Sequence, residues 1–504
     1  MTHHYDVVVV GSGAGGGTVA QALVPLVSQG KRVLVLEKGA RFDPSDMTGR
    51  ELEMADALYE DRGGFLTADG TMTLAFGRAY GGSTVVYTGT SLLPPRRVIE
   101  EWGVPGLEFG DLEDRARRYA GENNVHDLEP ALINDNNRLF LAGCRELGWN
   151  AEQFPINVKG CHGSSLCNLG CPNGAKQGTH QVQLPAAERG GVQVVTRAEV
   201  VRIDPSDRSL IVEVRPRVPG GKGRPGEWAP GQHRVGAGII VVAGGSIGSS
   251  ALLLRSGLGQ RLPRLGHGFT CHPAHVLVAE HDESITNDVG HPKSYYLDHW
   301  EEGYVLETCM YFPFITAKNL TGFGPAHSRL MGAFPRLQMI LVLALDKAVP
   351  ENRIEVDRAG RPVVHYRFTD RVIDSLVAAT RASARIFFAA GARRVHAPEA
   401  DPRLLEREDA GLIDRLITRE HFLPGTVSVS AAHLMGGCGM GASRAESVTD
   451  AWGRVHGLPW LRVADSALFP DSLEINPYLT IMGLADRVAE GVRTDLPTIG
   501  IPTS

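Results

Sequence analysis

Two segments near the C-terminal end carry the residues best suited to acid/base chemistry. One reads His433-Leu-Met-Gly-Gly-Cys-Gly-Met-Gly441, and the other reads Asn476-Pro-Tyr-Leu-Thr-Ile-Met482. A histidine titrates near neutrality, so it suits a general base. An asparagine amide can orient an oxygen atom without competing for its proton. Because most of the 18 histidines are expected to be ordinary structural residues, His433 needs its motif context before a role is assigned.

Three cysteines, Cys161, Cys167 and Cys171, form the pattern C-x5-C-x3-C-P. Thiolates this close in sequence, with glycine and proline between them, can converge on one soft metal centre. Two alternatives stay open: a turn with packed thiols, and a zinc site with His162 as fourth ligand.

A glycine-rich turn near the N-terminus indicates where a dinucleotide would be held. The apolar run 7–10 is typical of a strand buried on both faces. It leads into Gly11, Gly13 and Gly16, which suit a tight turn, a close approach to a pyrophosphate and close helix packing. The sequence therefore predicts a strand, a phosphate-binding turn and a helix in succession.

The following segments strengthen this prediction. We expect a helix from about 17 to 26, whose N-terminal N–H groups face the phosphates, and a second strand over 32–37. Glu37 then stands where an acid can accept hydrogen bonds from ribose hydroxyls. The motif cannot choose between FAD and NAD, but no second complete fingerprint follows, so a separate NAD(P) site is not expected.

With these residues in place, the chain resembles the glucose–methanol–choline (GMC) oxidoreductases along nearly its whole length. Within the family it is most similar to the branch of long-chain alcohol oxidases, cholesterol oxidases and bacterial FAD sugar dehydrogenases. Four segments carry the resemblance: the opening fingerprint, the loop Gly81-Gly82-Ser83, the stretch 243–249 with Gly245, and the tail 433–482. The resemblance implies FAD-dependent oxidation of an alcohol to an aldehyde or ketone.

The resemblance also implies catalytic roles. His433 would take the hydroxyl proton while the hydride passes to flavin N5, and Asn476 would orient the alcohol oxygen. Oxygen or an electron-transfer partner would be the final acceptor. Two other classes stay open: a non-redox lyase of the same family that uses FAD structurally, and a flavin-binding module that only assembles with a partner.

Cofactor contacts follow from the same resemblance. Asp465 would lie near the ribityl or diphosphate group, the Val200 backbone would meet the adenine, and Pro477 would lie against the isoalloxazine ring. FAD would be non-covalent, because Val86 stands where some members carry a tethering histidine. The cysteine run is similar to a segment of bacterial FAD-dependent glucose and sorbitol dehydrogenases that holds a 3Fe-4S cluster, and also to a Cys-rich segment of the long-chain alcohol oxidases.

The expected fold is α/β (α+β overall), in two domains. The resemblance implies a Rossmann-like FAD-binding domain built from the discontinuous segments 1–95, 185–270 and 430–504. The segments 96–184 and 271–429 would form a substrate-binding domain with a mainly antiparallel sheet and helices. Apolar periodicity within it predicts a strand over 337–345, a hairpin over 353–368 and a helix over 372–390.

Composition sets the remaining expectations. At 504 residues the chain is too long for one core, and its 43% hydrophobic and 21% charged residues are typical of a globular protein. A net charge of −6 gives no reason to expect nucleic acid or an anionic membrane as partner. Without a recognisable signal peptide or transmembrane run, we expect a cytoplasmic protein with reduced cysteines. The apolar stretch 304–345 suits either a domain core or an alcohol with a hydrophobic body, so sugar, polyol and aminoglycoside substrates stay open.

Overall fold

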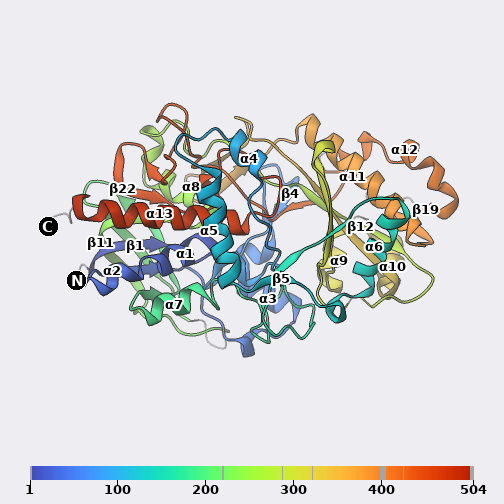
Figure 1. The fold of residues 1–504 in the computed structure, drawn as a ribbon, viewed down its shortest axis with the longest axis horizontal. Coiled ribbons are helices and arrows are strands. Elements are labelled where there is room, and N and C mark those ends of the chain that lie inside the picture. Colours follow the sequence, from blue (N-terminus) through green and yellow to red (C-terminus); the bar gives the residue numbers. More distant parts are fainter. Residues whose placement is uncertain are drawn as a thin grey trace.

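The computed structural model describes residues 3–217, 221–286, 288–320, 322–397, 404–423 and 425–499. Two lobes lie side by side along the long axis, and both chain ends lie at the outer end of one lobe (Figure 1). Each lobe is built around its own sheet. None of the helices in these ranges is long and apolar enough to cross a bilayer.

The lobe that carries the termini contains a mainly parallel sheet. Its strand order is β21-β22-β11-β1-β2-β8, and the hairpin strands β9 and β10 extend it beside β11. The strands are β1 (His3–Val10), β2 (Val33–Leu36), β8 (Gln193–Val195), β9 (Ala198–Asp204), β10 (Ser209–Val214), β11 (Gly231–Val242), β21 (Arg454–Val455) and β22 (Leu458–Val463). Strand β1 pairs in parallel with both β2 and β11, and its valine run 7–10 is buried, as expected for a central strand covered on both faces. The fold class expected from the sequence, a Rossmann-like unit of discontinuous segments, is confirmed.

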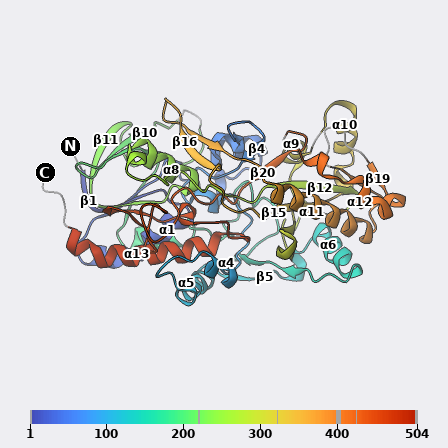
Figure 2. The same ribbon diagram turned by 90° about the horizontal axis from the view of Figure 1, so that it is seen from above.

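Helices cover this sheet and connect its strands. Helix α1 (Ala14–Ala22) follows β1 and packs against α7 (Gln183–Arg189) and α13 (Tyr478–Ile499), while α5 (Phe109–Glu122) packs along α13. Seen from above, α13 and α5 lie on the same side of the molecule (Figure 2). Helix α1 begins at Ala14, three residues earlier than expected, because Gly13 serves as its N-cap and the following glycines form its first turn.

The second lobe contains a mainly antiparallel sheet, as expected. Its order is β3-β4-β20-β12-β15-β14-β13-β6, with β18 beside β12 and β19 beside β18. The strands are β3 (Phe65–Leu66), β4 (Met72–Leu74), β6 (Glu152–Gln153), β12 (Ala274–Glu280), β13 (Tyr295–His299), β14 (Tyr304–Thr308), β15 (Leu337–Ala344), β18 (Arg394–His396), β19 (Leu404–Glu406) and β20 (Val429–Ala431). Strands β3 and β4 come from the stretch 1–95, so that stretch contributes to both sheets.

Three elements predicted within the segment 271–429 are confirmed. The strand expected at 337–345 is β15, and the hairpin is formed by β16 (Arg353–Val356) and β17 (Pro362–His365). The helix expected at 372–390 is α11 (Asp370–Ala389), which packs over the antiparallel sheet. The remaining helices are α2 (Val24–Ser28), α3 (Glu51–Leu58), α4 (Arg96–Glu101), α6 (Asp135–Glu146), α8 (Gly245–Arg255), α9 (Pro313–Asn319), α10 (Gly324–Gly332) and α12 (Ile413–Leu416).

Candidate active site

A cavity of about 680 Å³ lies where the carboxyl ends of β1, β2 and β11 face the antiparallel sheet. This volume falls within the range of cofactor and ligand pockets. The carboxyl edge of a parallel sheet is also where open α/β folds bind their ligands. Most of the residues predicted to hold the cofactor line the cavity: Gly11, Gly13, Glu37, Gly82, Ser83, Val200, Gly245, Asp465 and Pro477.

Gly16 and Gly81 are not lining residues but shape the cavity wall. A Cβ at Gly16 would lie 2.0 Å from the carbonyl oxygen of Gly11, so the helix can approach the strand only without a side chain there. A Cβ at Gly81 would lie 2.7 Å from the Cβ of His180, and a Cβ at its neighbour Gly82 would lie 2.7 Å from the Cα of Gly13. The two glycine-rich loops therefore meet backbone to backbone beside the cavity, where the N-terminal end of α1 also lies, an arrangement that suits a phosphate.

Ser12 and Glu37 join these two loops. The Glu37 carboxylate accepts hydrogen bonds from the N–H and hydroxyl of Ser12 and from the N–H of Gly39, at 2.7–3.0 Å. The Ser12 hydroxyl in turn accepts a hydrogen bond from the N–H of Gly81. Burial raises the pKa of Glu37, and these donors partly oppose the rise. Since a carboxylate can accept about four hydrogen bonds, Glu37 keeps capacity for a ribose hydroxyl while it holds the turn.

Asp465 plays a similar part on the opposite wall. Its Oδ2 accepts from Gly245 N–H and the Ser249 hydroxyl, at 2.9 and 2.5 Å, and its Oδ1 accepts from Ala467 N–H at 2.7 Å. Burial raises the pKa of Asp465 to about 6. The residue thus fixes the third glycine-rich loop against the chain segment that leads to Asn476.

The predicted pair His433 and Asn476 meets at the cavity wall. His433 follows β20 of the antiparallel sheet, whereas Asn476 precedes α13 of the other lobe. The side-chain nitrogen Nδ2 of Asn476 lies 3.2 Å from Nε2 of His433, and both residues line the cavity. Two residues that are 43 positions apart in the chain therefore face one volume, beside the glycine-rich loops.

A second histidine, which the sequence did not single out, lies behind His433. Nδ1 of His272 is 3.0 Å from Nδ1 of His433, and Nε2 of His272 is 3.2 Å from the Ser472 hydroxyl. The sheet explains this neighbour, because β12 pairs antiparallel with β20 at Ala274 and Ser430, and a further bridge between Thr270 and Met435 brackets the two histidines. Only the strand pairing reveals it, since the two histidines are 161 residues apart.

A buried ion pair completes the site. The Lys293 ammonium, on the cavity wall, donates to the Glu307 carboxylate, and both side chains are almost fully buried. Burial, aided by the positive charge of Lys293, lowers the pKa of His433 to about 3. His433 is therefore neutral at physiological pH, which is the state that can accept a proton. Neither Lys293 nor Glu307 was suggested by the sequence, because no local motif contains them.

The structure does not support the metal site proposed for the three cysteines. Among the described residues, no three His, Cys, Asp or Glu side chains are placed to hold a metal ion together. Burial raises the pKa of the Cys167 thiol to about 12, and its backbone carbonyl accepts from the buried Lys176 ammonium at 2.6 Å. Lys176 also donates to the carbonyls of Val85 and Tyr87. The segment with the cysteines thus reads as a packed loop that supports the second glycine-rich loop.

Comparison with known families agrees with this geometry. Family models described as GMC oxidoreductase match residues 55–274 and 349–485. An uncharacterized GMC-type oxidoreductase of Mycobacterium tuberculosis is 32% identical over 96% of this chain and 75% of its own length. The chain belongs to the GMC oxidoreductase family. Membership of this family makes it an oxidoreductase that binds FAD, and the cavity with its glycine-rich loops is consistent with that cofactor.

Other GMC relatives indicate the range of reactions nearby. A long-chain-alcohol oxidase of Arabidopsis thaliana is 27% identical over 96% of this chain and 66% of its own length. The paromamine 6'-oxidase of Streptomyces fradiae is 28% identical over 98% of this chain and 92% of its own length. Among solved structures, pyridoxine 4-oxidase from Mesorbium loti superimposes with a TM-score of 0.69 at 17% identity, covering 96% of this chain and 98% of its own. That level of likeness establishes the shared fold.

Proposed function

We propose that this protein oxidises an alcohol to an aldehyde or ketone, with His433 as the base. The observation that carries the proposal is the 3.2 Å contact between His433 Nε2 and Asn476 Nδ2 on the wall of the FAD cavity. A substrate hydroxyl within hydrogen-bond distance of both groups would take the place of this direct contact, accept a hydrogen bond from the amide and donate its proton to Nε2. FAD, when bound, supplies the hydride acceptor.

The chain's own residues prepare this step. Desolvation keeps His433 neutral, and Asn476 fixes the orientation of the substrate oxygen. Lys293 places a positive charge on the cavity wall, where it favours negative charge that develops on that oxygen. We further propose that FAD is held without a covalent bond, since Val86 offers no nucleophile on the loop that contacts it.

The cavity favours an alcohol with an apolar body. Away from the glycine-rich loops its wall includes apolar side chains of β15, of the segment that leads into α9 and of the first turn of α9, chiefly Met310, Tyr311, Phe314, Ile315 and Leu341. Binding the alkyl groups of a substrate against such a surface is favourable, because it removes apolar area from water. The similarity to long-chain-alcohol oxidases points the same way, and we propose oxygen as the acceptor because these relatives are oxidases.

The test is anaerobic reduction of the purified holoenzyme by a panel of alcohols, which includes long-chain, aromatic and polyol compounds. We expect the yellow flavin to bleach with at least one apolar alcohol, and His433→Gln to slow bleaching by about 10²–10⁴-fold. His275→Gln is the matched control, since His275 is buried on β12 and bonded to Thr380, away from the cavity. Product formation with a permanently oxidised flavin, or no bleaching with any alcohol, would contradict the proposal.

A further inference from the structure

We propose that Glu474 is a positioning residue, whose carboxylate joins the two lobes and thereby holds Asn476 against His433. This inference rests on the proposed alcohol oxidation, in which Asn476 orients the substrate oxygen. Glu474 stands two residues before Asn476 in the chain, but it is not among the residues that line the FAD cavity. It therefore acts through Asn476 and does not touch the substrate.

The first argument is the conformation and burial of Glu474. Its φ is 69°, a left-handed conformation that costs free energy for a residue with a side chain. Its side chain is only 4% exposed, although an isolated carboxylate is strongly disfavoured in a protein interior. Both features persist only where the surroundings hold a residue in place, so the contacts of this side chain must offset both costs.

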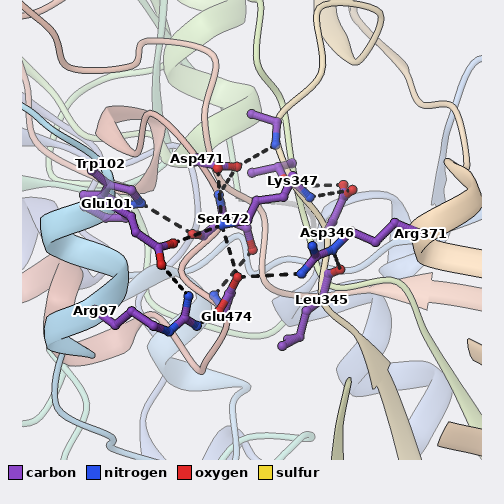
Figure 3. Close-up of polar contacts among 12 residues, drawn as sticks. Arg97, Glu101, Trp102, Leu345, Asp346, Lys347, Arg371, Asp471, Ser472 and Glu474 are labelled. Carbon is purple, nitrogen blue, oxygen red and sulfur yellow. Dashed lines mark hydrogen bonds and ion pairs between the residues drawn. The ribbon is translucent and has the colours of Figure 1, made fainter. Parts of the chain in front are cut away.

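The second argument is the set of three cations around this carboxylate, which Figure 3 shows. Arg97 of α4 donates to one carboxylate oxygen, Oε2. The Lys347 ammonium lies 3.1 Å from the other oxygen, Oε1, and the Arg371 guanidinium lies 3.9 Å from it. Lys347 follows β15, and Arg371 stands in the first turn of α11. Both oxygens of one buried carboxylate thus face positive charge.

These cations belong to different lobes. Val98 and Ile99 of α4 are buried in the hydrophobic core of the lobe with the parallel sheet. Strand β15 belongs to the antiparallel sheet of the other lobe, and α11 packs over that sheet. Glu474 therefore binds cations of both lobes at once, from the segment that leads into α13.

Further contacts fix the segment that precedes Asn476. Asp471 Oδ1 accepts a hydrogen bond from the N–H of Ala348, beyond β15, at 2.6 Å. On the other side, at the end of α4, the indole N–H of Trp102 donates to the Ser472 carbonyl at 3.4 Å. The segment is thus attached to both lobes, and its position sets where the Asn476 side chain lies.

Glu474 also lies directly behind the proposed catalytic pair. A small cavity of about 10 Å³, with room for about one water molecule, is lined by Glu474, Asn476 and His433. A shift of Glu474 would therefore reach Asn476 both along the chain and across this narrow space. Because a displacement of about 1 Å near the reacting groups can slow a reaction about 10²-fold, even a small shift should be measurable.

The experiment measures anaerobic flavin bleaching in wild-type holoenzyme, in Glu474→Gln and in the matched control Glu101→Gln. Glu101 binds the same Arg97 at 2.8 Å and lies 3.6 Å from Lys347, but it is 46% exposed and stands on α4. With an alcohol that bleaches the wild type, we expect the rate at saturating alcohol to fall about 10–100-fold in Glu474→Gln. Glu101→Gln should stay within about twofold of the wild type, because exposed ion pairs contribute little.

A double-variant cycle separates positioning from a general loss of stability. If Glu474 acts through Asn476, Glu474→Gln should slow bleaching in the wild-type background but add almost nothing in the Asn476→Ala background. Equal slowing in both backgrounds would mean that Glu474 acts independently of Asn476, and this would overturn the proposal. A Glu474→Gln protein that bleaches as fast as Glu101→Gln would also overturn it.

A second variant keeps the test decisive if Glu474→Gln does not fold. Arg97 is 37% exposed, and its replacement leaves Lys347 beside the Glu474 carboxylate. Arg97→Gln should therefore fold and should slow bleaching, and the slowing should again disappear in the Asn476→Ala background. Bleaching of Arg97→Gln at the wild-type rate would contradict the positioning role.

A further readout needs no substrate. Asn476 and Pro477 line the FAD cavity, so a displaced segment should change the visible circular dichroism of the bound, oxidised flavin in Glu474→Gln but not in Glu101→Gln. A wild type that no alcohol bleaches would refute the alcohol oxidation. In that case the dichroism still decides the role of Glu474, because an unchanged spectrum in Glu474→Gln would show that the segment does not depend on it.

Discussion

Replacing Ser12 by alanine tests how the first two glycine-rich loops are held together. Ser12 is fully buried, and its hydroxyl donates to Glu37 at 2.7 Å and accepts from Gly81 N–H at 2.9 Å. The alanine variant removes both bonds and adds no steric conflict. It leaves the Gly81 N–H without this partner in a region that water does not reach.

The size of the effect follows from these two bonds. A buried N–H left without a partner costs about 1–3 kcal/mol, and a hydrogen bond to a charged group contributes about 1.5–3 kcal/mol. Because the loops relax partly, we expect the arrangement of the two loops that binds FAD to be destabilised by about 3 kcal/mol. Because 1.4 kcal/mol corresponds to a factor of ten, FAD should bind roughly 100-fold more weakly.

The assay is titration of apoprotein with FAD, followed by flavin fluorescence, alongside thermal melting of the apoprotein. Ser206→Ala is the matched control, because Ser206 makes a comparable pair of bonds to Asp204 on an exposed turn. The control should match the wild type in both measurements. If Ser12→Ala binds FAD as tightly as the control does, the two loops are not held together in the way the hydrogen bonds indicate.

Three further predictions concern stability. Gly16→Ala should lower the melting temperature and weaken FAD binding, because its Cβ would clash with the carbonyl oxygen of Gly11. Gly121→Ala on the exposed face of α5 is the control, since its Cβ would meet open space, and it should be neutral or slightly stabilising. Equal melting temperatures of the two variants would count against the packing argument. The pKa of Asp465 rises from 3.8 to about 6 on folding, so its contribution to the free energy of unfolding is complete below about pH 4 and is lost as the pH rises through 6. Asp465→Asn should therefore flatten the pH dependence of the apoprotein melting temperature between about pH 4 and 6. An unchanged profile would refute this. Lys293→Met leaves Glu307 buried without its cation and should lower the free energy of unfolding by about 3–5 kcal/mol. The double variant Lys293→Met/Glu307→Leu should recover part of this loss. A double variant no more stable than the single one would argue against the ion pair.

Sequence patterns predicted the elements that depend on neighbours in the chain. The strand β1, the close packing at Gly16 and the helix α11 follow from apolar periodicity and glycine spacing, which are local properties. The resemblance to the family located His433 and Asn476, and the structure brings them together. The chain's membership of the family and its fold class are confirmed.

The parts that could not be predicted depend on contacts between distant segments. His272 lies next to His433 only because β12 pairs with β20, and no spacing in the sequence encodes that register. The role of Ser12 likewise depends on Glu37 and Gly81, which lie in other segments of the chain. The three cysteines are close in sequence, but closeness along the chain does not fix where their sulfur atoms point.

The origin of His433 and Asn476 in different lobes has a practical consequence. His433 follows a strand of the antiparallel sheet and Asn476 stands at the entry to α13, so we expect turnover to depend on how the two lobes dock against each other. Mild heating that separates the two lobes by about an ångström should abolish activity, while circular dichroism still shows intact secondary structure. Inactivation would then occur at a lower temperature than melting. A covalent link between the two lobes would raise the temperature at which activity is lost.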